Sequence, residues 1–90
     1  MKPKLEEIFS DSPTFRIISF LISNEDRLLN KSQIIEDSKI GRNTFYKRIN
    51  KLLALNIILE IGEDRTKLYK INNNHPLIKC LIDLRKKGII

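Results

Sequence analysis

The sequence predicts a single α+β domain, mainly helical, in which three helical segments are followed by a β-hairpin and a last helix. Two observations lead to this fold class. Apolar residues recur at helical spacing until about residue 56, and the pattern then changes to short β-branched and alternating runs. A length of 90 residues suits one small domain, which buries only about 60–65% of its unfolded surface, so an exposed apolar stripe is expected to meet a partner.

The charge balance narrows the class of partner. A net charge of +6 and a pI of about 9.7 favour a polyanion, either nucleic acid or an anionic membrane surface. A basic protein without such a partner is the alternative.

Cysteine and histidine usage argues against a disulfide or a metal site. A single cysteine, Cys80, and a single histidine, His75, cannot build an internal disulfide or a four-ligand zinc site. We therefore expect no metal, no cofactor and a reducing, cytoplasmic location.

No apolar run approaches 20 residues, and acids interrupt "MKPKLEEIFSDSP", so neither a membrane span nor a secretion signal is expected.

The first part of the chain predicts an arm and a helix. Residues 1–12 form an arm or short helix with Leu5, Ile8 and Phe9 at helical spacing. Ser12 then suits the N-cap and Pro13 the first turn of a helix that ends near Asn24. Its expected apolar face consists of Phe15, Ile18, Leu21 and Ile22.

The next segment carries a detailed helix start. Asn30 suits the N-cap, with Gln33 as its reciprocal partner, and Leu29 with Ile34 can form a hydrophobic staple. This helix of about two turns should stop near Ser38. Only three or four residues separate it from the helix that begins after Gly41, which is the spacing of a helix-turn-helix.

The helix over residues 42–55 has two contrasting faces. Phe45, Ile49 and Leu52 form a core stripe, while Asn43, Lys47 and Asn50 lie on the opposite side. From residue 39 to 56 there are five cations and no acid, so this face forgoes the ion pairs that stabilise ordinary exposed helices. Asn and Lys can read base edges in a major groove, and the flanking cations Arg42, Arg48 and Lys51 can neutralise phosphates. A plain solvated surface is the alternative.

After residue 56, "IILEI", "GEDRT" and "KLYKI" predict a β-hairpin with Gly62 and Asp64 in a loop of about five residues. Tyr69 and Ile71 should face the core and Lys70 the solvent. A last helix, "PLIKCLIDLRKK", starts at Pro76 within residues 75–88.

The stretch "NKSQIIEDSKIGRNTFYKRINKLLALNIIL" followed by "EDRTKLYKI" resembles the winged helix-turn-helix transcriptional regulators of bacteria and archaea, broadly the arsenical-resistance and antibiotic-resistance repressor types. The resemblance implies a winged-helix core over residues 13–71, with a three-helix core, a hairpin wing and an added C-terminal helix. It implies that Gly41 is an N-cap, that Arg42, Asn43 and Thr44 enter the groove, and that Arg65 and Lys67 lie in the wing. Lys39 and Asn56 depart from the family, which often has Gly at both positions, although Asn tolerates a left-handed backbone.

The expected function is a sequence-specific, double-stranded DNA-binding transcriptional regulator, with residues 42–55 in the major groove and the wing, 62–67, on the flanking backbone or minor groove. The expected DNA contacts are Arg42, Asn43, Thr44, Tyr46, Lys47, Arg48, Asn50, Lys51, Arg65 and Lys67. The alternatives are a winged helix that binds another protein, and a non-specific DNA- or RNA-binding architectural protein.

The last helix is more apolar than a small monomer needs, which favours a homodimer. The expected interface residues are Leu5, Ile8, Phe9, Leu77, Leu81 and Leu84. Packing of this helix on its own domain is the alternative.

We do not expect an enzyme, because the acids occur as adjacent pairs that point apart on a helix and no Ser-His-Asp or Cys-His arrangement is apparent. His75 is expected to be a cap or turn residue and Cys80 a small apolar residue of the last helix, with redox sensing through an inter-chain disulfide as the alternative for Cys80.

Overall fold

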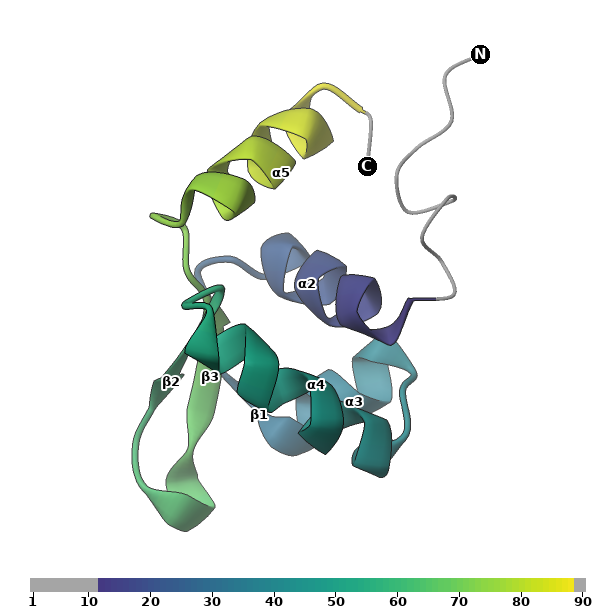
Figure 1. Cartoon of the computed structure of the whole chain (residues 1–90), viewed down its shortest axis with the longest axis vertical. Helices are drawn as coiled ribbons and strands as arrows, with labels where there is room; N and C mark the ends of the chain where they lie inside the picture. The colour runs from purple at the N-terminus through teal and green to yellow at the C-terminus, as the bar shows by residue number, and fades with distance from the viewer. Residues whose placement is uncertain (1–11, 89–90) are drawn as a thin grey trace.

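The computed structural model describes residues 12–88 and has an α+β architecture in which helices predominate (Figure 1). This confirms the predicted class and the order of the predicted elements. The elements are α2 (Pro13–Ser23), β1 (Leu29–Asn30), α3 (Lys31–Ser38), α4 (Arg42–Ala54), β2 (Ile58–Ile61), the 3-10 turn η1 (Asp64–Thr66), β3 (Leu68–Ile71) and α5 (Pro76–Lys86).

Helix α2 is the central helix of the fold. It begins as predicted, with the Phe15 N–H donating to the Ser12 hydroxyl at 3.2 Å. Its buried residues are Ile17, Ile18, Leu21 and Ile22. Three residues of the expected apolar face are among them and Phe15 is half-buried, whereas the fully buried Ile17 was not predicted. Figure 1 shows α2 between α5 on one side and α4 on the other, which agrees with a buried face wider than one stripe and with the burial of Ile17.

The predicted capping box of α3 is confirmed. The Gln33 N–H donates to the Asn30 side chain, and the Asn30 N–H donates to the Gln33 side chain. Helix α3 ends at Lys39, whose φ of 56° lies in the left-handed region. The Arg16 guanidinium of α2 donates to the Lys39 carbonyl at 3.2 Å, which ties this turn to the central helix.

One strand was not predicted from the sequence. Residues Leu29 and Asn30 form β1, which pairs with β3 in a three-stranded antiparallel sheet of order β1-β3-β2. A strand of two residues is too short to produce an alternating pattern. Its pairing sets the start of α3 beside the β2–β3 hairpin.

The hairpin itself follows the prediction closely. Register runs from Ile58 opposite Ile71 to Ile61 opposite Leu68, and Tyr69 and Ile71 are buried as expected. The connection has six residues, 62–67, and includes η1. At its start a glycine is required, because Gly62 has φ 99° and an added Cβ would lie 2.6 Å from the Thr66 carbonyl oxygen.

Helix α5 covers the side of α2 away from α4 (Figure 1). His75 caps it as predicted, with its Nδ1 accepting from the Leu77 N–H at 3.1 Å. Ile78 is fully buried, and Leu81 and Ile82 pack against the core. No helix among residues 12–88 has both the length and the apolar character needed to cross a membrane.

Candidate nucleic-acid interface

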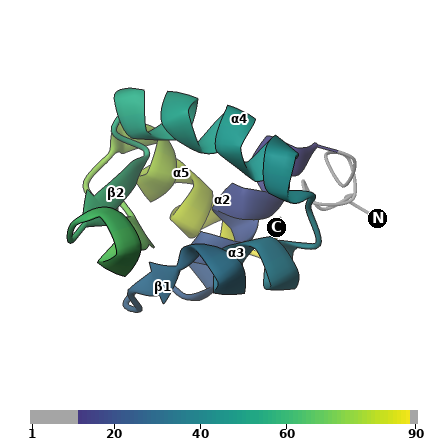
Figure 2. The ribbon, with the colours of Figure 1, turned by 90° about the horizontal axis from the view of Figure 1, so that it is seen from below.

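Helix α4 presents one face to the core and the other to solvent. Phe45, Ile49 and Leu52 are at most 3% exposed, as predicted. Figure 2 shows α4 along one edge of the molecule, across from α3 and with the hairpin near its C-terminal end. Gly41 is the N-cap, as the resemblance implied, and its backbone is extended, with φ −73°. The turn between α3 and α4 is therefore only residues 39–41.

The solvent face of α4 carries most of the predicted contact residues. All of them on this helix are exposed except Thr44, which is half-buried. Five side chains make no hydrogen bond and no ion pair within residues 12–88: those of Asn43, Lys47, Arg48, Asn50 and Lys51. Helix α4 contains no acid. This face therefore presents amide donors and acceptors together with uncompensated cations.

Tyr46 is held at the edge of this face by a contact with α3. The Lys31 ammonium donates to the Tyr46 hydroxyl at 2.8 Å and lies 5.0 Å from the centre of its ring. This hydrogen bond from Lys31, together with nearby Arg42, holds the pKa of Tyr46 below its ordinary value of 10.0. Because Lys31 supplies the donor to the phenol oxygen, the Tyr46 O–H is free to donate to a further acceptor.

A cation-lined hollow connects the start of α3 with the hairpin. It has a volume of about 240 Å³, and its lining residues are Asn30, Lys31, Ser32, Arg65 and Lys67. We call it the basic hollow. The β1–β3 pairing brings its two sides together, although they are more than 30 residues apart in the chain. Three cations around one hollow suit an anion such as a phosphate.

Lys31 and Ser32 were missed as site residues. In the sequence, "NKSQ" indicates a helix cap, and that interpretation explained Asn30 and Gln33 completely. The available signal was the position of a Lys and a Ser in the first turn of a helix, where backbone N–H groups also favour anions.

The two predicted hairpin cations differ. Lys67 Nζ lies 3.4 Å from Glu60 Oε1, and their side chains are 38% and 29% exposed. Part of the Lys67 charge is therefore compensated inside the hairpin. Arg65, in the 3-10 turn, is exposed.

The residues expected at a dimer interface fall into two groups. Leu5, Ile8 and Phe9 lie outside the described residues. On α5, Leu77 is 46% exposed, whereas Leu81 and Leu84 are half-buried and Leu81 packs against the domain's own core. Cys80 was expected to be a small apolar residue of this helix, but it is an exposed free thiol.

Within residues 12–88, no three His, Cys, Asp or Glu side chains cluster in a way that could hold a metal ion. The chain matches no protein-family model, and neither the curated proteins nor the solved structures contain a significant match to it. The function is therefore argued from the geometry.

Proposed function

We propose that this protein is a DNA-binding transcriptional regulator of the winged helix-turn-helix type, in which α3 and α4 form the helix-turn-helix and the β2–β3 hairpin is the wing. The supporting observation is the solvent face of α4: exposed amides and cations, no acid, and five polar side chains without a partner among the described residues. Such a face gains stabilisation from a polyanion that it does not obtain within its own fold.

In this proposal the α4 side chains divide into two roles. Asn43, Lys47 and Asn50 lie opposite the buried stripe and read base edges, where Asn suits adenine and Lys suits guanine acceptors. Flanking cations meet phosphates, as do the groove-entry residue Thr44 and the Tyr46 hydroxyl. The flanking cations are Arg42, Arg48 and Lys51.

The basic hollow extends the same interface beyond α4. Lys31, Ser32 and Arg65 surround a space of about 240 Å³, and the Lys31–Tyr46 hydrogen bond links that space to the face of α4. A phosphate of the DNA backbone bounding the groove would be held there. Lys67 contributes less than Arg65, because Glu60 already compensates part of its charge.

A regulator of this kind acts in the cytoplasm as a two-fold homodimer, with half-site centres about 34 Å apart, one turn of DNA. On α5 the proposed contact includes Leu77, whose side chain is 46% exposed. Leu77→Glu should give a monomer of 10.6 kDa without unfolding, which light scattering after gel filtration would detect. It is a sharper test than a change at Leu81, which also packs on the core. A wild type that is already monomeric at all concentrations would contradict the dimer.

A second candidate function is a protein-interaction module. The observation that favours it is an apolar outer side of the sheet region, where Leu28, Leu59 and Ile61 are 46%, 37% and 45% exposed. A non-specific DNA- or RNA-binding architectural role is a third candidate, since phosphate contacts alone carry no sequence information.

Selection of bound sequences from a pool of random duplexes, followed by salt titration on the selected site, separates these candidates. Regulation of specific genes predicts a recovered palindrome and a log affinity that falls with log salt by about 0.9 per neutralised phosphate. A steep salt dependence with no recovered sequence would favour the architectural role. The absence of binding to any duplex at low salt would refute DNA recognition and favour the protein-interaction module.

A further inference from the structure

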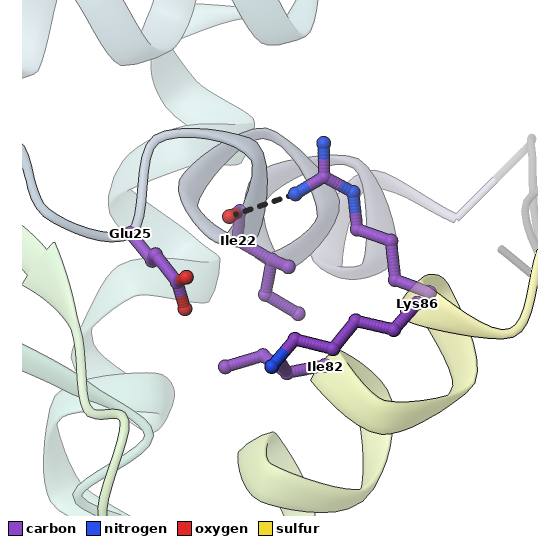
Figure 3. Close-up of a pocket in the computed structure, with 5 residues that line it drawn as sticks. Ile22, Glu25, Ile82 and Lys86 are labelled. Atoms are coloured by element: carbon purple, nitrogen blue, oxygen red, sulfur yellow. Dashed lines mark hydrogen bonds between the residues drawn. The ribbon is translucent and has the colours of Figure 1, made fainter.

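A cavity between the end of α2 and α5 contains charged side chains that the proposed DNA interface does not use. Its volume is about 230 Å³, and it is lined by Ile22, Glu25, Ile82, Arg85 and Lys86 (Figure 3). Ile22 and Ile82 form an apolar floor. A neighbouring hollow of about 280 Å³ shares Ile22, Glu25 and Arg85, so the depression continues around the end of α2.

Charges of opposite sign face this apolar floor. In Figure 3 the Glu25 carboxylate and the long Lys86 side chain reach toward the same space, with Ile22 and Ile82 between them. Neither Glu25 nor Lys86 forms an ion pair with another described residue. The neighbouring acid of α5, Asp83, is already paired with Lys87 at 3.0 Å.

Arg85 is exposed, and one hydrogen bond ties its side chain to α2. One nitrogen of its guanidinium donates to the Ile22 carbonyl at 3.2 Å, close to the end of α2 (Figure 3). A guanidinium has five N–H donors, so one such bond holds the group in place and leaves others for a ligand. A planar guanidinium held in this way suits a carboxylate.

The arrangement of charges selects the ligand chemistry. A simple carboxylate would gain from Arg85 and Lys86 but would be repelled by Glu25, and a simple amine would meet the opposite conflict. A zwitterion satisfies both sides, with its carboxylate toward the two cations and its ammonium toward Glu25. An aliphatic side chain on the same molecule would cover the floor and remove apolar surface from water.

The volume sets the size of the ligand. The hollow is open to solvent, and its volume of about 230 Å³ is below the range of about 300–1,000 Å³ for pockets that hold drug-sized ligands, so it suits one small molecule. We propose that the cavity between α2 and α5 binds a free aliphatic α-amino acid. The site lies on the α5 side of α2, whereas α4 lies on the other side (Figure 1), so the proposal holds whether or not α4 binds DNA.

The test is calorimetric titration of the whole chain with L-leucine, L-valine and L-isoleucine, supported by chemical shifts of the Ile22 and Ile82 amides. Two analogues each lack one charge: 4-methylpentanoate has no ammonium, and 3-methylbutylamine has no carboxylate. At least one amino acid should bind, and each analogue should bind at least about tenfold more weakly, the loss expected for one charge-assisted contact. No binding of any of the three amino acids at millimolar concentration, or equal binding of an analogue, would overturn the proposal.

Variants with matched controls locate the site. Glu25→Gln and Lys86→Gln should each weaken amino-acid binding about tenfold. Their controls are Glu36→Gln on α3 and Lys79→Gln on α5, exposed residues that do not line the cavity, and both should bind as the wild type does. If Lys79→Gln weakens binding as much as Lys86→Gln, the effect is one of net charge and the assignment of the cavity is wrong.

Discussion

Helix α4 and the β2–β3 hairpin are the two elements proposed to meet DNA, and their charges differ. Helix α4 has four cations and no acid. The hairpin, residues 58–71, has three acids and three cations, so its net charge is zero: Glu60, Glu63 and Asp64 against Arg65, Lys67 and Lys70. Within the hairpin, Lys67 already contacts Glu60.

This difference indicates unequal roles. The cations of α4 are uncompensated and should supply most of the phosphate attraction, which is the main source of affinity for DNA. The hairpin places Arg65 in the same hollow as Lys31, because β3 pairs with β1. We therefore expect α4 to dominate affinity and sequence choice, and the hairpin to act mainly through position.

The largest expected effect is on the free energy of unfolding, when the Phe45 ring that contacts both elements is removed. The Phe45 ring lies edge-on to Tyr46 in α4 and to Tyr69 in the hairpin, with centroids 5.7 and 6.1 Å apart. Phe45→Ala should cost about 3–5 kcal/mol of unfolding free energy through the cavity it leaves, measured by urea denaturation. Lys47→Ala, on the opposite face, should stay within about 0.5 kcal/mol of the wild type. Equal losses would mean that α4 is not amphipathic as described.

Substitution of one glycine in each element tests the backbone geometry of the hairpin and of α4. Gly62→Ala in the hairpin should cost more than about 1 kcal/mol, because φ is 99° and the new Cβ would meet the Thr66 carbonyl. Gly41→Ala at the start of α4 should cost less than about 1 kcal/mol, since its φ is −73° and the nearest atom to a Cβ lies 3.8 Å away. Thermal unfolding of both variants checks this order, and a reversed order would contradict the turn geometry.

Base readout should reside in α4. Lys47→Ala and Asn50→Ala should each cost about 1–3 kcal/mol on a selected duplex and much less on random DNA. Fluorescence anisotropy on both duplexes measures the difference. Arg65→Ala in the hairpin should weaken both complexes alike. If the α4 variants also lose the same binding free energy on the two duplexes, the protein binds DNA without sequence specificity.

The salt dependence of DNA affinity should rank the cations by how much each contributes to neutralising phosphates. Arg48→Ala should reduce the slope of log affinity against log salt by about 0.9, whereas Lys67→Ala should reduce it less because of its contact with Glu60. Glu60→Gln should enhance the salt dependence, since it releases Lys67. A wild-type slope in Arg48→Ala with a large change in Lys67→Ala would reverse the comparison between helix and hairpin.

The smallest expected effect is a change in the pH titration of Tyr46, which is followed by absorbance. The Lys31 hydrogen bond lowers the pKa of Tyr46 on α4, while burial and Glu60 raise the pKa of Tyr69 in the hairpin above its ordinary value of 10.0. Phenolate absorbance should therefore appear in two steps as pH rises, Tyr46 first. Lys31→Met should move the first step to higher pH, because the phenolate loses its donor. A first step that does not move would contradict the contact between α3 and α4.

Much of the fold was predictable because its signals are local. The capping box at Asn30, the cap at His75 and the stripe Phe45, Ile49 and Leu52 depend on residues within one or two turns of each other. The omission of Ile17 from the predicted face of α2 has a different origin. Periodicity predicts one buried stripe, but α2 lies between α5 and α4, and only the tertiary structure shows that Ile17 belongs to the core as well.

The candidate site likewise has features that the sequence predicts and features that only the tertiary structure shows. The sequence by itself determined the uncompensated solvent face of α4, since the position of a side chain around a helix follows from its number in the chain. Only the tertiary structure decided that Lys31 lies beside Tyr46, that Arg65 shares a hollow with Ser32, and that Glu60 compensates Lys67. These contacts arise where α3 packs beside α4, where the two-residue strand β1 meets β3 and where the hairpin closes on itself, and contacts between separate segments have no periodic signal in the sequence.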